Sequence, residues 1–587
     1  MRDSTFGGKV AVAILCLMFV GIFVHGQEAN PPVAQSPLWC RHTIFVYVSP
    51  GGASLDFWTK ENLQWLAAYC DPEGKPQDLF FDGFQMIGFG CKGGRHLLPL
   101  KSRKPAIRSD WEDAIRNYLA VTEKLSEAFE DVAGALNKPD AMGKVILSMP
   151  YPDTRQKAFG PVNARTLDLS KDPERIVAMK WYIDEAIRQW QEREKQGKLK
   201  RVRLVAFYWG HEGVGDTDRQ VFKSVASHVH DRGYLMHWIP CFGGARRDWR
   251  ELGIDCVTQQ INYQNPQKPG RPLTIFDDKT AVAREYGLHG TEMTPMARMK
   301  LLNPRIWSWH QVHLANLEAA LRLKWEEFPA MTYFHGGDLP RLATDPKARI
   351  FYDMLYKWVK GDLTWQDLDE LSAAVLDDLR SRECIDGETY KQIAAADTVL
   401  KKLQRMEEPK LEANRRALQT FLAEYAKSSG NLLGDGSFET GMEDWPTVSR
   451  YVSRTETDAC DGKWSLQLSL EPGSGRDVIT AYVKTKQVPV QPGQIVRLRA
   501  KVKMPEGLKS TDRGLLIGLA RFHKGKMVAT WTECEARRID ATDGWKTLTT
   551  HLIPKDKPCD AALAIIGMCG VGTAYVDDVE LVTLSKP

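Results

Sequence analysis

The stretch Val202–Gly213, VRLVAFYWGHEG, decides how the rest of the chain is interpreted. It begins as an apolar, β-branched and aromatic run, which predicts a buried strand. It ends in Tyr208 and Trp209, followed by His211 and Glu212. A carboxylate at the end of a buried strand, beside flat rings, is typical of a sugar site, because rings stack on a pyranose and partial desolvation raises the pKa of a glutamate. A solvated glutamate or a local cap is the alternative.

A second glutamate stands in a similar place, since Glu292 in Tyr286–Pro295, YGLHGTEMTP, also ends a short apolar run. Two carboxylates at two strand ends need a scaffold that brings them together. Between residues 43 and 360, short apolar runs alternate with amphipathic helical stretches, which predicts an α/β fold, a (β/α)8 or TIM barrel. The predicted strands are Thr43–Val48, Leu79–Ile87, Lys144–Met149, Val202–Trp209, Tyr234–Ile239, Ile254–Ile261, Tyr286–Thr291 and Ala330–Phe334.

The intervening segments predict helices by their spacing of apolar residues. They are Ser109–Leu136, Asp172–Gln196, Asp216–Arg232, Phe276–Glu285, Pro304–Glu327 and Asp345–Lys360, with Leu55–Tyr69 as a weaker case.

The C-terminal part of the chain changes composition twice. Residues 361–429 are charged and helix-periodic, and we expect two or three helices that form a spacer. Residues 430–587 contain short alternating strands separated by turns with Gly, Pro or Asp, which predicts an all-β sandwich.

The N-terminus predicts export. Residues 1–26 combine a charged start, an apolar run and small or polar residues, as a signal peptide does, and residues 27–39 form a leader. An uncleaved anchor is the alternative, and no other run is long enough to span a membrane. We therefore expect a soluble, secreted or periplasmic protein. The net charge of +4 over 587 residues does not indicate a nucleic-acid partner.

The eleven cysteines do not predict a zinc site, because they are scattered singly without a CxxC pair. Export permits disulfides, most plausibly among Cys460, Cys534, Cys559 and Cys569, but their connectivity is not readable from the sequence.

The predicted barrel places Glu212 at the end of strand 4 and Glu292 at the end of strand 7. This pairing resembles the clan of retaining glycoside hydrolases with a (β/α)8 barrel. The segments FFDGFQMIGFG, VAFYWGHEG and GTEMTP are also similar to an uncharacterised bacterial domain family grouped with glycosidase barrels, over roughly residues 40–360. The resemblance implies Glu212 as acid/base and Glu292 as nucleophile. His211 stands where the clan usually has Asn, which affects the expected contact to the sugar 2-hydroxyl.

The mechanism implied by this resemblance is a two-step displacement, in which ionised Glu292 attacks the anomeric carbon and protonated Glu212 protonates the leaving oxygen. It requires carboxyl groups about 5–5.5 Å apart, whereas about 6.5–9.5 Å would imply inversion.

Other polar and aromatic residues near predicted strand ends are candidates for substrate binding. Tyr263 is expected to donate a hydrogen bond to Glu292, and a loop tyrosine is the alternative. Asp82 lies inside an apolar run, so it either faces the barrel mouth or pairs with an arginine. Trp238 is a platform or a core residue, and His211 orients its neighbours. The full set is Asp82, Tyr208, Trp209, His211, His237, Trp238, Tyr263, His335 and Asp338.

Basic residues are frequent in the loops expected at the same end of the barrel. A solvated rim is one interpretation, and arginine forks that bind an anionic glycan are the other. These residues are Lys92, Arg95, Lys101, Arg103, Lys104, Arg108, Arg155, Lys157, Arg165, Arg246 and Arg247.

The segment from residue 431 to the end resembles the jelly-roll carbohydrate-binding modules that are often fused to glycosidases, through NLLGDGSFETGMEDW and AYVDDVEL. In those modules, Glu439 and Asp577 match positions that hold a structural calcium ion, for which carboxylate oxygens are suitable ligands. Trp445 and Trp531 are either sugar platforms or core residues.

Three functions are compatible with these patterns. The first is a glycoside hydrolase with an appended binding module and no catalytic cofactor. The second is a non-catalytic glycan-binding surface protein on a barrel scaffold. The third is a polysaccharide lyase, which would use a Tyr or His base and release unsaturated products.

Overall fold

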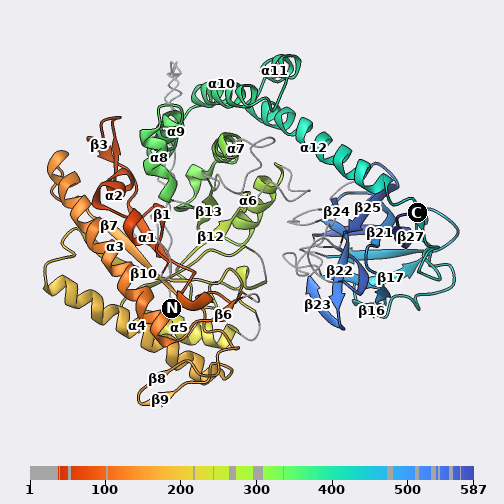
Figure 1. Cartoon of the computed structure of the whole chain (residues 1–587), viewed down its shortest axis with the longest axis horizontal. Helices are drawn as coiled ribbons and strands as arrows, with labels where there is room; N and C mark the ends of the chain where they lie inside the picture. Colours follow the sequence, from red (N-terminus) through yellow and green to blue (C-terminus); the bar gives the residue numbers. More distant parts are fainter. Residues whose placement is uncertain are drawn as a thin grey trace, which may run out of the picture.

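Eight strands of the N-terminal region close into a barrel in which every strand pairs in parallel with its neighbours (Figure 1). The strands follow each other around the barrel in the order of the sequence, as predicted. They are β1 (His42–Tyr47), β4 (Gly83–Ile87), β7 (Gly143–Met149), β10 (Val202–Trp209), β11 (Leu235–Trp238), β12 (Cys256–Gln260), β13 (Gly290–Met293) and β14 (Ala330–Tyr333).

This is a computed structural model of the 587-residue chain, and it describes most of residues 38–587. The described residues are 38, 40–49, 54–100, 103–215, 218–241, 244–263, 273–294, 309–334, 336–471, 480–508, 514–529, 537–539, 542–553, 559–568 and 570–587, without the side chains of 309, 407–415, 417, 529 and 537–539. Among them, no helix combines the length and the apolar character that a membrane crossing requires.

Helices cover the outside of the barrel between most of its strands. They are α1 (Ser54–Phe57), α2 (Lys60–Ala67), α3 (Arg108–Ala135), α4 (Asp172–Lys195), α5 (Arg219–Asp231), α6 (Ile275–Glu285), α7 (Trp309–Arg322), α8 (Leu339–Thr344) and α9 (Arg349–Lys360). The connection from β11 to β12 differs, because its described residues 244–255 contain only the 3-10 turn η3 (Gly244–Arg246) and no α-helix.

The barrel region buries two apolar layers. The larger one lies between the strands and the surrounding helices and includes Trp111, Trp209 and Trp238. The smaller one lies inside the barrel and includes Phe45, Ile146 and residues of several other strands. Because side chains of a strand alternate between its two faces, neighbouring residues belong to different layers.

Three helices follow the barrel, and the last of them leads to the C-terminal domain (Figure 1). They are α10 (Trp365–Ser381), α11 (Gly387–Ala394) and α12 (Val399–Ala423). Thr364 caps α10 reciprocally with Asp367, since the Thr364 hydroxyl accepts the Asp367 N–H and the carboxylate accepts the Thr364 N–H.

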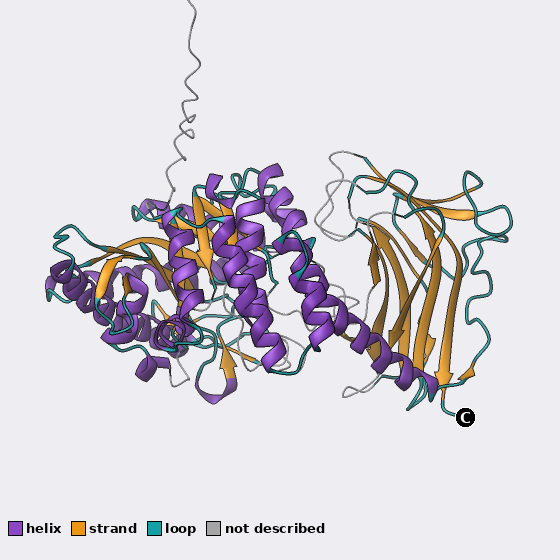
Figure 2. Ribbon diagram, turned by 90° about the horizontal axis from the view of Figure 1, so that it is seen from above, coloured by secondary structure: helices purple, strands orange, loops and turns teal. Residues whose placement is uncertain are grey.

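The C-terminal domain is built from two antiparallel sheets, whose strands lie at the far end of α12 in Figure 2. The central strands are long and alternate between buried and accessible residues, as in β21 (Ile495–Lys503). One sheet has the order β17 (Val452–Thr455), β18 (Ser465–Leu470), β27 (Gly572–Ser585), β21 and β25 (Lys546–Leu552). The other has the order β16 (Thr447–Val448), β19 (Ala481–Lys484), β26 (Ala561–Met568), β22 (Leu515–His523) and β23 (Lys526–Ala529). The predicted sandwich is confirmed.

Free thiols among the described residues include those of Cys40, Cys70, Cys91 and Cys256. Of the four named as candidates for disulfides, Cys460 and Cys559 have free thiols, whereas Cys534 and Cys569 lie outside the described residues.

Candidate active site

A close turn after β10 brings Glu212 over the carboxyl end of the barrel. A side chain at Gly210 would place its Cβ 2.6 Å from the carbonyl oxygen of Met149, so the turn requires glycine. The loop is then held from the neighbouring strand, because Trp238 Nε1 donates a hydrogen bond to the carbonyl of His211 at 2.9 Å. The N–H of Cys241 also reaches the carbonyl of Glu212 at 3.4 Å.

Glu292 lies in β13 and is almost completely buried, with 1% of its surface exposed. Gly290 permits this strand to pair closely with β14, because a Cβ there would lie 1.7 Å from the carbonyl oxygen of Ala330. Burial raises the pKa of Glu292 well above its usual value, and the nearby charge of Glu212 raises it further, while polar contact with Gln260 partly offsets both. The two carboxylates are therefore electrostatically coupled.

Gln260, at the end of β12, joins the two carboxylates. Its Nε2 donates a hydrogen bond to Glu212 Oε1 at 3.2 Å, and its backbone pairs with that of Glu292 in the sheet. Sequence reasoning missed this residue. The sequence did contain a signal for it: in the run VTQQI, Gln260 is a polar residue at the end of a buried strand, on the face that points into the barrel.

Tyr208 and His237 lie inside the barrel beside this pair. Burial, followed by the charges of Glu212 and Glu292, raises the pKa of Tyr208 well above its usual value. Its ring lies 5.6 Å from that of His237, measured between centroids. His237 Nδ1 forms a 2.9 Å hydrogen bond with Gln85 Oε1, and burial lowers the pKa of His237 to about 3, so the imidazole is neutral.

The structure corrects the expectation that Trp209 and Trp238 bind substrate. Both are almost fully buried in the layer between strands and helices, where they pack on Phe222 of α5 at ring distances of 4.8 and 6.3 Å. The cause is strand alternation, because Tyr208 and His237 occupy the inward positions and the adjacent tryptophans must face outward.

The remaining candidates near this end have mixed positions. His211 is partly buried, its Nδ1 contacts the carbonyl of Gly213, and its ring lies 4.8 Å from that of Tyr151. Tyr263 is buried and packs against Phe276 of α6. The side-chain hydrogen bond that lowers the pKa of Glu292 comes from Gln260. Asp338 ends the 3-10 turn after β14 and precedes α8. His335 lies outside the described residues.

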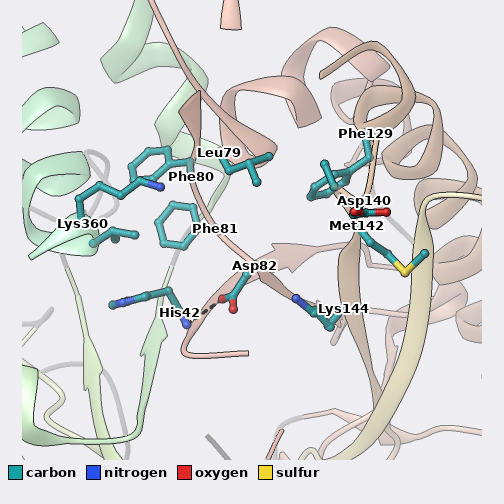
Figure 3. A pocket seen from close by; sticks show the side chains of 12 residues that line it. His42, Leu79, Phe80, Phe81, Asp82, Phe129, Asp140, Met142, Lys144 and Lys360 are labelled. Carbon is teal, nitrogen blue, oxygen red and sulfur yellow. Dashed lines mark hydrogen bonds between the residues drawn. The ribbon is translucent and has the colours of Figure 1, made fainter. Parts of the chain in front are cut away.

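The prediction that Asp82 binds substrate is wrong, because Asp82 lies at the amino end of the barrel, opposite Glu212 and Glu292. Its carboxylate accepts the backbone N–H groups of Arg41 at 3.1 Å and His42 at 2.9 Å. It lines a cavity of about 330 Å³ there, together with Phe81 and Lys144 (Figure 3). Asp82 does not face the barrel mouth, and it pairs with no arginine side chain among the described residues.

Several of the basic loop residues have acidic partners, which weakens the interpretation as an anion-binding rim. Arg95 pairs with Asp110, and Arg155 pairs with Asp153. Arg108 and Arg165 are paired with Glu112 and Glu174, and buried Arg246 donates to Gln259 Oε1 at 2.8 Å. Lys92, Arg103, Lys104 and Lys157 are exposed, and Lys101 lies outside the described residues.

The two carboxylates proposed as calcium ligands hold backbone groups. Glu439 Oε1 accepts the N–H groups of Lys463 and Trp464 at 2.9 and 2.8 Å, and Asp577 Oδ2 accepts those of Cys460 and Asp461 at 2.7 and 3.0 Å. These donors engage one oxygen of Glu439 and one of Asp577, and the structural calcium ion expected there stays a prediction. Over the described ranges, no group of three His, Cys, Asp or Glu side chains is arranged to hold a metal.

Of the two tryptophans predicted as sugar platforms or core residues of the sandwich, one is described by the structure. Trp445 is a core residue with 2% of its surface exposed, and Trp531 lies outside the described residues.

Residues 44–357 match the model of a domain of unknown function, DUF4855, which spans more than half of the chain. The chain belongs to this family. The expected membership of an uncharacterised domain family is thus confirmed, and the DUF4855 match covers every strand of the barrel except the first two residues of β1. A comparison with curated protein sequences gives no match.

Solved structures similar to this DUF4855 chain include carbohydrate-binding modules. The CBM22-1 xylan-binding domain of Paenibacillus barcinonensis Xyn10C is 19% identical, with a TM-score of 0.20, over 28% of this chain and 99% of that one. TmCBM61, solved in complex with β-1,4-galactotriose, is 17% identical, with a TM-score of 0.19, over 26% of this chain and 98% of that one.

Proposed function

We propose that this protein is a glycoside hydrolase with a TIM barrel, in which Glu212 and Glu292 carry the reaction. The observation that supports this most directly is the convergence of the two carboxylates on Gln260 at the carboxyl end of a closed parallel barrel. Active sites of parallel α/β barrels lie at that end. Two coupled carboxyl groups, one of them deeply buried, can divide the roles of acid and nucleophile.

The pair is expected to hold one proton at neutral pH, because burial and mutual repulsion oppose ionisation of both groups. In the free site the proton resides on Glu292, whose pKa is raised. This differs from the sequence-based expectation that Glu292 is ionised. For the retaining reaction, the proton has to lie on Glu212 once sugar is bound, which the positive charge developing at the anomeric carbon favours.

The reaction then proceeds in two steps. A Glu292 oxygen attacks the anomeric carbon while Glu212 gives its proton to the leaving oxygen, which breaks the glycosidic bond. Glu212 next takes a proton from water, and the resulting hydroxide group displaces Glu292 from the sugar. Trp238 and Gln260 keep Glu212 in place during both steps.

The test is release of reducing ends from a panel of neutral and acidic glycans by the full chain and its variants E212Q and E292Q. Both variants should lose roughly 10³-fold in rate and keep their fold, because each removes a group that moves a proton or forms a bond in the reaction. E251Q, at an exposed carboxylate in the β11–β12 connection, is the matched control and should retain the parent rate.

Three results would contradict the proposal. Binding of glycans without turnover by any form would identify a binding protein, and unsaturated products absorbing in the ultraviolet would identify a lyase. Equal turnover by the parent and E292Q would remove the carboxylate pair from the reaction. The anomeric configuration of the first product, measured by NMR, separates retention from inversion.

We also propose that the protein acts outside the cytoplasm, and that the sandwich contributes glycan binding. The apolar run in residues 1–26 and the module-like segments of residues 431–587 support these two proposals. N-terminal sequencing of the exported protein tests the first: a mature chain beginning near residue 27 is expected, and a chain that keeps residue 1 would contradict cleavage.

A further inference from the structure

A layer of polar side chains lines the carboxyl end of the barrel interior. Ser148, Tyr208, His237, Glu292 and Thr332 each stand one residue before the end of their strand, and Gln260 ends β12. Two positions earlier on β7, β10, β11 and β14, the inward residues are apolar: Ile146, Ala206, Leu235 and Ala330. On these four strands the interior is therefore filled by apolar side chains below and by polar ones at the mouth.

Several atoms of this layer are buried without a hydrogen-bond partner. Within the described part of the chain these atoms are Ser148 Oγ, His237 Nε2, Gln260 Oε1, Glu292 Oε1 and, just below them, Gln85 Nε2. Buried polar atoms are nearly always paired in native proteins, so a cluster without partners points to a ligand that supplies them. Such a cluster is costly to the fold unless it serves binding.

These atoms belong to one continuous group. The hydrogen bond between Gln85 and His237 joins β4 to β11, which are not neighbours in the sheet, so it crosses the interior. The ring of Tyr208 lies against His237, and Tyr208 is close enough to both glutamates for their charges to act on it. Gln260 completes the connection to Glu212.

The donors and acceptors of the group fit hydroxyl groups. Neutral His237 donates through Nδ1 to Gln85 Oε1, so its Nε2 is an acceptor, as is Gln260 Oε1. The protonated carboxyl group of Glu292 can donate or accept. Gln85 Nε2 is a donor, and the Ser148 hydroxyl takes either role. A sugar ring with several free hydroxyl groups both donates and accepts, and therefore satisfies such a set.

The charge of the layer restricts the sugar further. None of its inward-facing members is Lys or Arg, and its charges come from Glu212 and Glu292. A carboxylate or sulfate held here would lie beside two carboxyl groups in a buried place, with no cation from the layer to offset repulsion. The arginines of the surrounding loops that have acidic partners are already neutralised.

We propose that this layer is a subsite for a sugar unit that carries free hydroxyl groups and no anionic substituent. The inference rests on the proposed function, since it names the substrate class of the same site. Such a subsite disfavours the uronate or sulfate group that the basic loops suggested as part of the substrate.

Binding of iminosugars to the full chain, measured by calorimetry, tests the proposal. The probes are 1-deoxynojirimycin and its galacto, manno and xylo counterparts, with the C6-carboxylate analogue of each hexose-like compound. We expect at least one neutral-substituent probe to bind about ten-fold or more tightly than its carboxylate analogue. Equal or tighter binding of the analogue, or no binding of any probe, would overturn the subsite.

Glycan hydrolysis is measured separately, so the two proposals fail in different ways. Probe binding with the expected preference but without hydrolysis contradicts the hydrolase and leaves the subsite standing. Hydrolysis together with a preference for the carboxylate analogues contradicts the subsite alone.

A pair of serine variants distinguishes a binding role from a structural one. S148A removes a buried hydroxyl without a partner, so the affinity for the best probe should fall about ten-fold while Tm stays unchanged or rises. S126A is the matched control, because Ser126 in α3 is also buried but its hydroxyl accepts the backbone N–H of Arg201 at 3.0 Å. It should lower Tm and leave affinity unchanged. A lower Tm with unchanged affinity in S148A would contradict the proposal.

Discussion

The two ends of the barrel each contain a buried carboxyl group, Asp82 at the amino end and Glu292 at the carboxyl end. Burial raises the pKa of both. Their partners differ, because each oxygen of Asp82 accepts a backbone N–H, whereas Glu292 Oε1 has no partner among the described residues and a second carboxylate lies nearby. A shifted pKa therefore does not separate the two groups; the supply of hydrogen-bond partners does.

The other polar groups of the two ends differ in the same way. The cavity of about 330 Å³ at the amino end is lined by aromatic side chains, Asp82 and two lysines (Figure 3). Asp82 there joins β4 to the chain entering β1, and Lys360 is paired with Asp78 at 2.8 Å. Asp82 and Lys360 thus have partners that belong to the fold, whereas several buried polar atoms at the carboxyl end have none among the described residues.

The largest effect is expected from E292Q. It should lower the rate of reducing-end release by roughly 10³-fold, because the amide cannot act as nucleophile or exchange a proton with Glu212. Its Tm should be equal to the parent or higher, since a buried ionisable group is removed. Initial rates and thermal unfolding of the same preparation check both parts. A large fall in Tm would assign Glu292 to the fold, like Asp82.

D82N should give the opposite result. The amide has a single acceptor oxygen, so one of the two backbone N–H groups, of Arg41 or His42, faces an NH₂ group instead. We expect a loss of about 1–3 kcal/mol in the free energy of unfolding. Urea unfolding measures this loss, and the rate per folded molecule should match the parent. A rate loss at full stability would mean that the amino end also contributes to the reaction.

The sequence predicted the barrel because its strands are apolar runs between helix-periodic segments, and all eight appear in the structure. Glu212 was identifiable because it follows a buried run, and Glu292 because it lies near the end of another, one residue before the end of β13. The error at Asp82 arose because Leu79–Ile87 was interpreted as one strand. The segment Pro76–Leu79 instead forms β3, which pairs with β2 (Ala68–Cys70), and β4 begins only at Gly83.

The direction of side chains was less predictable. In FYWGHEG every residue before the glycine is apolar or aromatic, so the sequence does not show which of Tyr208 and Trp209 faces inward. Both faces of a barrel strand are buried, which removes the polar alternation that would mark them. Gln260 was missed for a related reason, because VTQQI places two glutamines on opposite faces, Gln259 toward Arg246 and Gln260 toward Glu212.

A pH series sharpens the comparison by following the charge of Glu292. Below about pH 4 the carboxyl group is protonated in both the folded and the unfolded chain. As pH rises, the unfolded chain ionises first because the folded pKa is raised, so the parent loses stability until pH passes the folded pKa. E292Q lacks this loss.

The difference in unfolding free energy between E292Q and the parent should therefore increase in favour of the variant from pH 4 to pH 8. Urea unfolding at each pH measures it. In the background of E212Q the increase should be smaller, since removal of the Glu212 charge lowers the pKa of Glu292. A difference that does not change with pH would show that Glu292 ionises as an exposed glutamate does.

The smallest effect is expected from W238F, which tests how the Glu212 loop is held. Phenylalanine keeps the contact with Phe222 but removes the indole N–H that binds the carbonyl of His211 at 2.9 Å. One neutral hydrogen bond contributes about 1 kcal/mol, so we expect a modest loss of stability. The rate should fall several-fold with little change in KM, because Glu212 is less well oriented in the transition state.

W111F is the control, since the buried indole N–H of Trp111 has no partner among the described residues and lies away from the loop. An equal rate loss in both variants would show that packing, and not the hydrogen bond to His211, positions Glu212.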